Sequence, residues 1–531
     1  MDTDNTIKEK PKVFLKKIYF NDGTELTLHH NSIVVFTGAN NCGKSQVLKD
    51  IEVCLDASYH AGKIVATGAD CEYIGTIDQA DFLKDNFMLN AQGDYSQITS
   101  GIVFNISTLN VWWKNQTLNN GLYSLFAHRL STEARLSSSN ALIRNNNPER
   151  HPIYKMTNSE KLSQKISDYF RQAFGSDLIV NRNEMLTVPL HVGQAPDKKA
   201  FTIANQDDYY KIVNTLPKLQ EQGDGMRSFV SILLNTFTSD YTITLIDEPE
   251  AFLHPPQARI LGKMLAKNNP DDRQLFIATH SEDFLLGLLD ADDANVTIIR
   301  IDRENNINRM SILKNNRIKE LWGNPILRYS NILSGLFHDK VVVCESDYDC
   351  LFYQAIINSI YEKKNEIAPD MLFTHCGGKN RIKDIVIALK AVNVPVVAIT
   401  DFDILNQSSN FKPLAAAFAI DWNLSLASDM KTIYDSMNAR SSNGFDAWAQ
   451  IKKNGKMGFL GDEPAAYENV EKICKLAGLF IVPVGEMECF EKTVGKEKKD
   501  WVYYILENYD LAEESKLESA RKFVEEIISF K

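Results

Sequence analysis

The chain has 531 residues, of which 44% are hydrophobic and 24% are charged, and its formal net charge is −11. At about 150 residues per domain, this length predicts a globular protein of two to four domains. The negative charge excludes a surface coated with nonspecific nucleic-acid-binding groups, whereas a local basic groove remains compatible with it.

The start of the chain and its cysteines give no indication of export. The first residues, Met1-Asp2-Thr3-Asp4, lack the basic and apolar segments of a secretion signal. No apolar run approaches the roughly 20 residues of a membrane helix. The eight cysteines are scattered and form no CxxC pair, so neither a disulfide framework nor a zinc ribbon is indicated. We therefore expect a cytoplasmic protein with reduced thiols and no membrane partner.

The first strongly patterned region surrounds a phosphate-binding motif. Asn21-Asp22-Gly23 predicts a hairpin turn, and Ser32–Thr37 predicts a buried strand. Residues 38–45 read Gly-Ala-Asn-Asn-Cys-Gly-Lys-Ser, which fits G-x-x-x-x-G-K-[ST], and residues 46–51 have the composition of a helix.

In this motif, backbone N–H groups surround ATP phosphates at the positive end of the helix. Lys44 neutralises phosphate charge and the Ser45 hydroxyl binds Mg²⁺. A glycine-rich turn in another α/β domain is the alternative, and the apolar strand before the motif argues against it. The candidate nucleotide-binding residues are Gly38, Asn40, Asn41, Cys42, Gly43, Lys44, Ser45 and Gln46.

The stretch from about residue 54 to residue 219 separates this loop from its partner motifs. That distance indicates an insertion for dimerisation or for contact with a partner. Within it, Ile102–Ile106 predicts a strand. Apolar residues that repeat every four positions from Leu162 to Phe174 predict an amphipathic helix.

Two motifs after this stretch have the residues that phosphate chemistry needs. Gly223 and Gly225 precede an apolar helical run and form a second candidate anion site, for which a plain helix start is the alternative. The strand that follows ends in Asp247 and Glu248, at the sheet edge where open α/β folds bind ligands. We expect Asp247 to hold Mg²⁺ through water, and Glu248 to orient or deprotonate the attacking water.

A third motif follows a short helix. Gln274–Ala278 predicts a strand, and His280 lies just after its end. His280 is a candidate sensor of the γ-phosphate. A histidine with a structural role at the end of a strand is the alternative, and the order of the motifs favours the functional interpretation.

Together, these motifs resemble ABC-type ATPases of the SMC kind, and more closely the ATPase half of the OLD (overcoming lysogenization defect) nucleases. The resemblance rests on the phosphate loop, the glycine pair, the run Leu245–Glu250 followed by Leu-His-Pro, and the run Ala278–Ser281. It implies a homodimer whose two heads enclose ATP, with Gly223 and Gly225 of one subunit capping the γ-phosphate bound by the other.

The signature motif departs from that family pattern. Gln222-Gly223-Asp224 replaces the Ser-Gly-Gly of transporters, which removes a serine contact and adds an acid and so argues against fast turnover. The family also has a glutamine in its Q-loop, and three residues, Gln79, Gln92 and Gln97, are equally good candidates for it here.

A second α/β pattern begins near residue 338, after a predicted hairpin over 297–313 and a predicted helical linker. Each of its three apolar strands ends in acids, and the candidate metal ligands are Glu345, Asp349, Asp401, Asp403 and Glu488. Because the carboxyl ends of parallel strands share an edge, these acids are expected to converge and to need a cation. Oxygen ligands without His or Cys favour Mg²⁺ or Mn²⁺, and two such ions could promote phosphodiester cleavage.

The order E-x-x-x-D, D-x-D and G-x-x-E resembles the Toprim domain of topoisomerases, primases and OLD nucleases. A flavodoxin-like domain with acidic loops is the alternative. Ser346 replaces the usual glycine after Glu345, and Glu488 suits the pattern better than Glu486. Gly377–Arg381 is a candidate DNA-phosphate contact. Lys492, Lys496 or Lys498 could stabilise the scissile phosphate, and a solvated basic helix explains these lysines equally well.

These interpretations divide the chain into an ATPase head over residues 1–320, a helical linker over 321–337 and a Toprim-like domain over 338–531. The expected fold class is α/β, with an ABC/SMC-head-like P-loop ATPase followed by a Toprim-like parallel sheet. The expected catalytic residues are Glu248, His280, Glu345, Asp401 and Asp403.

We therefore expect an ATP-regulated, Mg²⁺-dependent DNA endonuclease of the OLD type, with a role in antiphage defence; whether ATP promotes or restrains cleavage stays open. The alternative is an ATPase scaffold with a degenerate Toprim-like domain that controls a separate HNH nuclease, as in Septu or retron systems. An SMC-like repair protein ranks last, because no sustained heptad pattern predicts a coiled coil.

Overall fold

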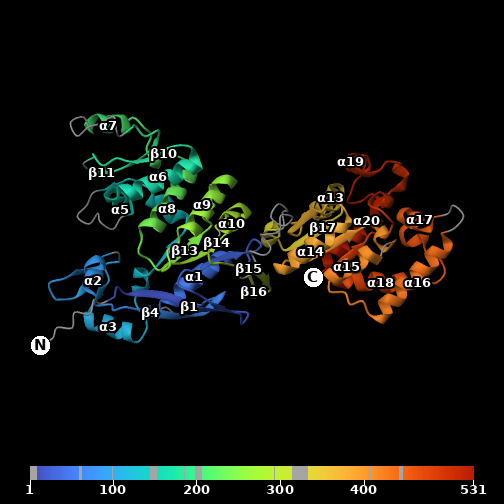
Figure 1. The fold of residues 1–531 in the computed structure, drawn as a ribbon, viewed down its shortest axis with the longest axis horizontal. Coiled ribbons are helices and arrows are strands. Elements are labelled where there is room, and N and C mark those ends of the chain that lie inside the picture. Colours follow the sequence, from blue (N-terminus) through green and yellow to red (C-terminus); the bar gives the residue numbers. More distant parts are fainter. Residues whose placement is uncertain are drawn as a thin grey trace. The chain divides into compact units, whose positions relative to one another are not determined.

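The structure, a computed structural model, describes residues 9–58, 62–98, 100–143, 152–184, 186–197, 206–291, 294–313, 333–406, 408–441 and 446–530. The chain divides into two compact units, residues 1–319 and 320–531 (Figure 1). Among the helices in the described ranges, none is long and apolar enough to cross a membrane.

The first unit is built on a six-stranded sheet. Its strands are β3 (Ile33–Thr37), β8 (Ala127–Leu130), β13 (Ile243–Asp247), β14 (Gln274–Ala278), β15 (Val296–Glu304) and β16 (Ile307–Leu313), in the order β16-β15-β3-β14-β13-β8. All neighbours are parallel except the hairpin of β15 and β16. β3 and β14 are buried along their whole length, as expected for parallel strands covered on both faces.

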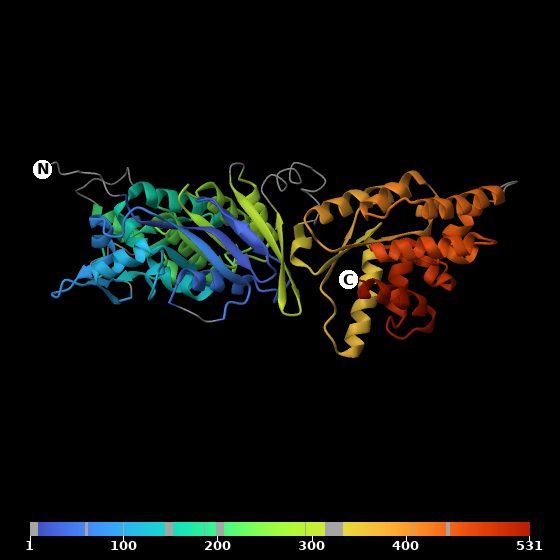
Figure 2. The same cartoon turned by 90° about the horizontal axis from the view of Figure 1, so that it is seen from below.

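A helix and a second sheet cover one face of this sheet. Helix α1 (Lys44–Leu55) packs between the central sheet and an antiparallel sheet of β1 (Lys12–Phe20), β2 (Glu25–Thr27) and β4 (Ala66–Ile74). The turn between β1 and β2 also bonds to the hairpin, because the Met310 N–H donates to Asp22 Oδ2 at 2.8 Å. Figure 2 shows these blue and yellow-green strands side by side.

Three helices lie on the opposite side of the central sheet, as Figure 1 shows. They are α8 (Asp224–Thr238), α9 (Pro255–Lys267) and α10 (Glu282–Leu289). Helix α8 buries ten of its fifteen residues, which include Phe229, Ile232 and Leu233. Its position puts the glycine pair at the start of a rigid, buried helix.

Residues 54–219, expected to be an insertion, also contribute to the core. They supply β4 to the antiparallel sheet and β8 to the central sheet. These strands could not be predicted from the sequence, because apolar and polar residues alternate only weakly in β4 and because β8 has only four residues. The rest forms three small sheets and several helices: α2 (Ala80–Asn86), β5 (Phe87–Leu89), β6 (Tyr95–Gln97), β7 (Val103–Phe104), α3 (Ile106–Lys114), α4 (Thr132–Ser138), β9 (Leu142–Ile143), α5 (Pro152–Asn158), α6 (Glu160–Phe174), β10 (Asp177–Val180), β11 (Thr187–Val188), β12 (Leu190–Gly193) and α7 (Gln206–Val213).

The second unit contains a four-stranded parallel sheet in the order β18-β17-β19-β20. The strands are β17 (Lys340–Cys344), β18 (Met371–His375), β19 (Val396–Thr400) and β20 (Leu479–Ile481). Most of the linker predicted over 321–337 lies outside the described residues, and its last residues, Leu333–Phe337, form a 3₁₀ turn.

Helices surround this second sheet. α13 (Asp347–Lys364), α19 (Lys498–Asn508) and α20 (Glu518–Ser529) bury their apolar residues with those of β17, β19 and β20 in one cluster. The remaining helices are α14 (Ile382–Ala391), α15 (Ser408–Ala417), α16 (Leu424–Arg440), α17 (Ala447–Asn454) and α18 (Glu463–Ala477).

Candidate functional site

The phosphate loop follows β3 directly and leads into α1. Gly38 and Gly43 have φ values of 140° and 109°, which favour glycine. A Cβ at Gly38 would lie 2.3 Å from the Ile301 carbonyl oxygen, so no other residue fits there. Lys44 is 9% exposed and its Nζ donates to the carbonyl oxygens of Gly38 at 2.9 Å and Ala39 at 2.8 Å. The lysine therefore lies over its own loop, at the N-terminus of α1.

The other predicted loop residues divide into exposed and buried groups. Asn40 and Asn41 are exposed, and Asn41 has a φ of 62°. Cys42 is buried, which raises the pKa of its thiol. The side chain of Gln46 is bonded within α1, where it donates to Asp50 Oδ1 at 2.7 Å. Cys42 and Gln46 can therefore face a ligand only through backbone groups in this conformation.

A residue that sequence patterns did not indicate supports the loop. Asn308 of β16 donates from Nδ2 to the Cys42 carbonyl oxygen at 2.6 Å. Its own N–H and Oδ1 bond to the side chain of Asn21 at 3.1 and 3.0 Å. The central part of the loop is thus attached to the β15–β16 hairpin, far away in the sequence.

The predicted Mg²⁺ pair is assembled in this structure. The Ser45 hydroxyl donates to Asp247 Oδ1 at 2.9 Å across the end of β13. The pKa of Asp247 is raised overall, because burial outweighs the opposing effects of this hydrogen bond and of the charges of Arg135 and Arg129. A hydroxyl beside a half-buried carboxylate suits a hard divalent cation and would ligate it from both sides.

Glu248 and His280 also come together. The Nδ1 atom of His280 lies 3.5 Å from Glu248 Oε1 and 3.5 Å from Glu250 Oε1. Glu250, which the sequence had not singled out, is 7% exposed and accepts hydrogen bonds from the Thr279 hydroxyl at 2.8 Å and the His280 N–H at 3.0 Å. Burial raises the pKa of Glu250. Glu250 thus holds His280 in place, and Glu248 is left facing outward.

The glycine pair lies at the start of α8, with Gly223 as its N-cap. A Cβ at Gly225 would approach the Phe252 carbonyl oxygen to 2.5 Å, so close packing requires this glycine. A Cβ at Gly223 would meet nothing within 4 Å. The acid of the unusual signature, Asp224, pairs with Arg227 Nη1 at 2.9 Å and is therefore neutralised within its own helix.

In the second unit, the predicted acids lie at the carboxyl edge of the sheet. Glu345 follows β17 and accepts a hydrogen bond from the Asp401 N–H, just after β19, at 3.1 Å. Ser346 is the N-cap of α13: its hydroxyl accepts from the Asp349 N–H at 3.3 Å, and the Asp349 carboxylate accepts in return from the Ser346 N–H at 2.9 Å. Ser346 therefore takes a capping role, which glycine could not fill.

Burial and the neighbouring carboxylates raise the pKa values of two acids at this edge, Glu345 and Asp401. Burial first, and then Asp403 and Asp349, raise the pKa of Glu345 to about 7. Burial and the neighbouring carboxylates, Glu345 foremost, raise the pKa of Asp401 well above its ordinary value. Buried, mutually repelling carboxylates with oxygen as the only ligand type fit Mg²⁺ or Mn²⁺. Among the described residues no ready-made metal cluster of His, Cys, Asp or Glu is present, so the ligand set stays a prediction.

Two lysines contact these acids. Lys379, from the predicted segment Gly377–Arg381, lies 3.0 Å from Asp403 Oδ1. Lys452 of α17, which the sequence did not reveal, lies 3.8 Å from Asp403 Oδ2 and 2.9 Å from Glu486 Oε1. Both can bind a phosphate that displaces their carboxylate partners.

The lysines near residue 495 have other contacts. Lys492 Nζ donates to Asn454 Oδ1 at 3.1 Å, and Lys496 Nζ lies 4.5 Å from the centre of the Tyr504 ring. The Lys498 N–H donates to Glu488 Oε1 at 2.6 Å, which ties Glu488 to the start of α19. Burial raises the pKa of Asp349, and the nearby charge of Glu488 raises it further.

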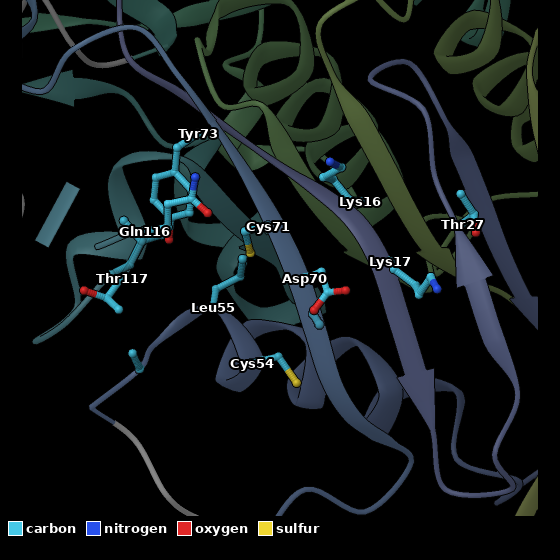
Figure 3. Close-up of a pocket in the computed structure, with 13 residues that line it drawn as sticks. Lys16, Lys17, Thr27, Cys54, Leu55, Asp70, Cys71, Tyr73, Gln116 and Thr117 are labelled. Carbon is cyan, nitrogen blue, oxygen red and sulfur yellow. The ribbon is translucent and has the colours of Figure 1, made fainter. Parts of the chain in front are cut away.

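A pocket of about 610 Å³ lies elsewhere in the first unit (Figure 3). It opens beside β1, β4 and the end of α1, where Cys54, Cys71 and Tyr73 line it. None of the predicted site residues lines this pocket.

The raised pKa of Glu345 predicts how stability depends on pH without metal. Its pKa of about 7 exceeds its ordinary value of 4.5. Protonated Glu345 therefore stabilises the fold at low pH, and this contribution is lost as the pH rises through about 7. We expect a Glu345→Gln variant to match the wild type near pH 5 and to melt at a higher temperature near pH 8. Thermal melts in chelator across this range test this, and equal melting temperatures near pH 8 would contradict it.

Two family models match the chain. One, described as "AAA domain, putative AbiEii toxin, Type IV TA system", matches residues 115–287, a range that contains both signature glycines, Asp247, Glu248 and His280. The other, described as "Overcoming lysogenization defect protein-like, TOPRIM domain", matches residues 336–403.

These matches define an AAA domain that is followed by a Toprim domain. More particularly, the chain combines an AAA ATPase domain with an OLD-like Toprim domain, as the motifs predicted.

Solved structures of SMC head domains are also similar to the chain. An SMC head bound to the C-terminal winged-helix domain of ScpA has 12% identity and a TM-score of 0.35, and covers 58% of this chain and 99% of that one. The SMC head domain from Thermotoga maritima has 12% identity and a TM-score of 0.28, with the same coverage. No curated protein matches the chain. The α/β fold class is confirmed, with a six-stranded, mostly parallel sheet in the first unit and a four-stranded parallel sheet in the second.

Proposed function

We propose that the protein is an ATP-hydrolysing, divalent-metal-dependent DNA endonuclease of the OLD type that acts in antiphage defence. One observation carries the proposal: the same chain holds the Ser45–Asp247 pair at a phosphate loop and a buried acid edge around Glu345 and Asp401. The first arrangement suits nucleotide hydrolysis, and the second suits phosphodiester cleavage.

In the ATPase unit, Lys44 would exchange its own loop carbonyls for the phosphates, whose charge it would neutralise, and Ser45 with Asp247 would hold Mg²⁺. Glu248, which is 42% exposed, accepts the proton of the attacking water. His280, held by Glu250, would donate to a phosphate oxygen. Two heads pair around ATP, with Gly223 and Gly225 of the partner completing each site.

In the Toprim unit, the residues that would hold a divalent cation are Glu345, Asp349, Asp401, Asp403 and Glu488. A bound divalent cation supplies an acidified water and stabilises the leaving oxygen. Lys379 and Lys452 exchange their contacts with Asp403 for contacts with the DNA phosphate, which positions the scissile bond.

Purified protein incubated with supercoiled plasmid and Mg²⁺ or Mn²⁺ tests the nuclease. We expect nicked or linear products that disappear with chelator. Cleavage that persists in chelator, or its absence under every nucleotide condition, would overturn the nuclease assignment.

A second candidate is an ATPase scaffold that controls a separate HNH nuclease, as in Septu or retron systems. The ion pairs of Lys379 and Lys452 favour it, because each lysine neutralises an acid at this edge, Asp403 and Glu486 respectively. A neighbouring gene for an HNH protein or a reverse transcriptase, together with an inactive Toprim unit, would support the scaffold.

Glu248→Gln tests the catalytic assignment in the ATPase unit. We expect ATP hydrolysis to fall by about 10²–10³-fold with ATP binding retained, because the amide cannot accept a proton. The variant should therefore accumulate as an ATP-bound dimer in size-exclusion chromatography. Glu9→Gln, at an exposed glutamate before β1, is the control. Wild-type turnover in Glu248→Gln would remove Glu248 from the mechanism.

A further inference from the structure

Arg135 is a charged side chain that the assignments above leave without a role. It lies on α4, is 0% exposed, and belongs to the stretch expected to be an insertion. Its guanidinium donates to the carbonyl oxygens of Asp247 and of Glu248, the latter at 3.0 Å, and to the Thr132 hydroxyl at 3.2 Å. A buried guanidinium is costly unless such bonds satisfy it, so its place in the fold is specific.

The peptide that Arg135 contacts has an unusual backbone. Glu248 has a φ of 47°, in the left-handed region that residues with a side chain rarely adopt. Its N–H donates to the Ala278 carbonyl oxygen at 2.8 Å, while Arg135 holds its carbonyl oxygen from the other side. Strained conformations persist at functional sites only where surrounding bonds enforce them. Arg135 therefore helps to fix the direction in which the Glu248 carboxylate points.

The same helix is joined to the signature helix α8. Arg227, one turn into α8, donates from Nη2 to the Leu136 carbonyl oxygen of α4 at 2.9 Å. The hydroxyls of Ser138 and Ser231 bond across the two helices. Since Arg227 also pairs with Asp224 in the first turn of α8, α4 connects the anion-binding end of α8 to the catalytic carboxylates.

We propose that α4 couples the signature end of α8 to the catalytic strand end, with Arg135 as the positioning residue for Glu248 and Arg227 as the link to α8. A phosphate that engages the N-terminus of α8 reorients Asp224 and Arg227, which shifts α4 and with it the peptide that carries Glu248. The inference rests on the proposed ATP hydrolysis and adds a route that regulates it.

Steady-state ATPase kinetics of Arg135→Gln and Arg135→Lys test the positioning role. We expect kcat to fall about tenfold or more in Arg135→Gln while KM for ATP changes by less than about threefold, because catalysis depends on alignment more steeply than binding does. Arg135→Lys keeps the charge but cannot bond both carbonyls, so it should restore only part of the rate.

Arg273 provides a matched control in the same unit. It is also buried, at 6% exposure, and like Arg135 it donates to backbone carbonyls, here those of Thr236, Ser239 and Tyr241, at the opposite end of β13. Arg273→Gln should lower the melting temperature as Arg135→Gln does and leave kcat within about twofold of the wild type. Equal losses of kcat in the two variants would show that Arg135 is merely structural.

Arg227→Gln tests the coupling, and it also decides the question if Arg135→Gln fails to fold. Its side chain is 21% exposed, so the fold should tolerate the change. We expect Arg227→Gln to have a lower kcat and to retain ATP binding. The double variant, Arg135→Gln with Arg227→Gln, should have a kcat within about twofold of that of Arg135→Gln alone, because both residues act through α4. An unchanged kcat in Arg227→Gln, or losses that multiply in the double variant, would overturn the coupling. If the wild type hydrolysed ATP no faster than Lys44→Ala does, the proposed ATPase function itself would be wrong.

Discussion

A Lys44→Ala variant should lose ATP hydrolysis by about 10³-fold, with ATP binding lost or greatly weakened. Lys44 is the one cation whose Nζ lies on the carbonyls of the phosphate loop among the hydrogen bonds described above. Alanine leaves the phosphates facing only backbone N–H groups. Hydrolysis assays and titration with a fluorescent ATP analogue measure the two effects.

The fold should survive this change. The hydrogen bonds of Lys44 go to its own loop, and they do not join distant elements. Lys49→Ala, an exposed lysine on the same helix, is the matched control and should behave as the wild type. Turnover in Lys44→Ala within about twofold of the wild type would remove the nucleotide assignment.

An Asp401→Ala variant should lose metal-dependent DNA cleavage by about 10³-fold while ATP hydrolysis stays unchanged. Asp401 follows the fully buried strand β19, and neighbouring carboxylates and burial raise its pKa well above the ordinary value. A buried acid in this position destabilises the metal-free fold at neutral pH, because its charged form is disfavoured.

Removal of this acid should therefore separate activity from stability. We expect metal-free Asp401→Ala to melt at a higher temperature than the wild type near pH 8 and to gain less stability from added Mg²⁺. Asp421→Ala, at an exposed acid, is the control for both measurements. If the Asp401→Ala variant still cleaved DNA, the cleavage would have to come from a contaminant or from another site of the protein.

The local motifs could be predicted from the sequence because their chemistry lies within a few residues. The glycines of the phosphate loop, the acids after β13 and the acids after β17 and β19 each stand at the end of an apolar run that marks a buried strand. Parallel pairing then brings strand ends to one edge, so the convergence of Glu345, Asp401 and Asp403 also followed from the pattern.

The supporting residues could not be predicted in this way. Arg135, Asn308 and Lys452 come from elements distant in the sequence, and their contacts depend on the path of the chain. Glu250 stood inside a recognised motif, but only the structure shows it turned inward beneath His280. The lysines from 492 to 498 were candidates for a phosphate contact by charge alone, and charge does not reveal which way a side chain points.

The amide of Asn308 has a mechanical consequence. It bonds the phosphate loop at Cys42 to β16, the last described strand before the chain enters the second unit. If the loop changes shape around a phosphate, we expect this bond to break or the hairpin to move with the loop. In either case we expect the amide protons of β16 to change their exchange with solvent. Hydrogen exchange in β16 should therefore report whether the phosphate loop has bound a nucleotide. This strand is also the last one described before the chain enters the second unit.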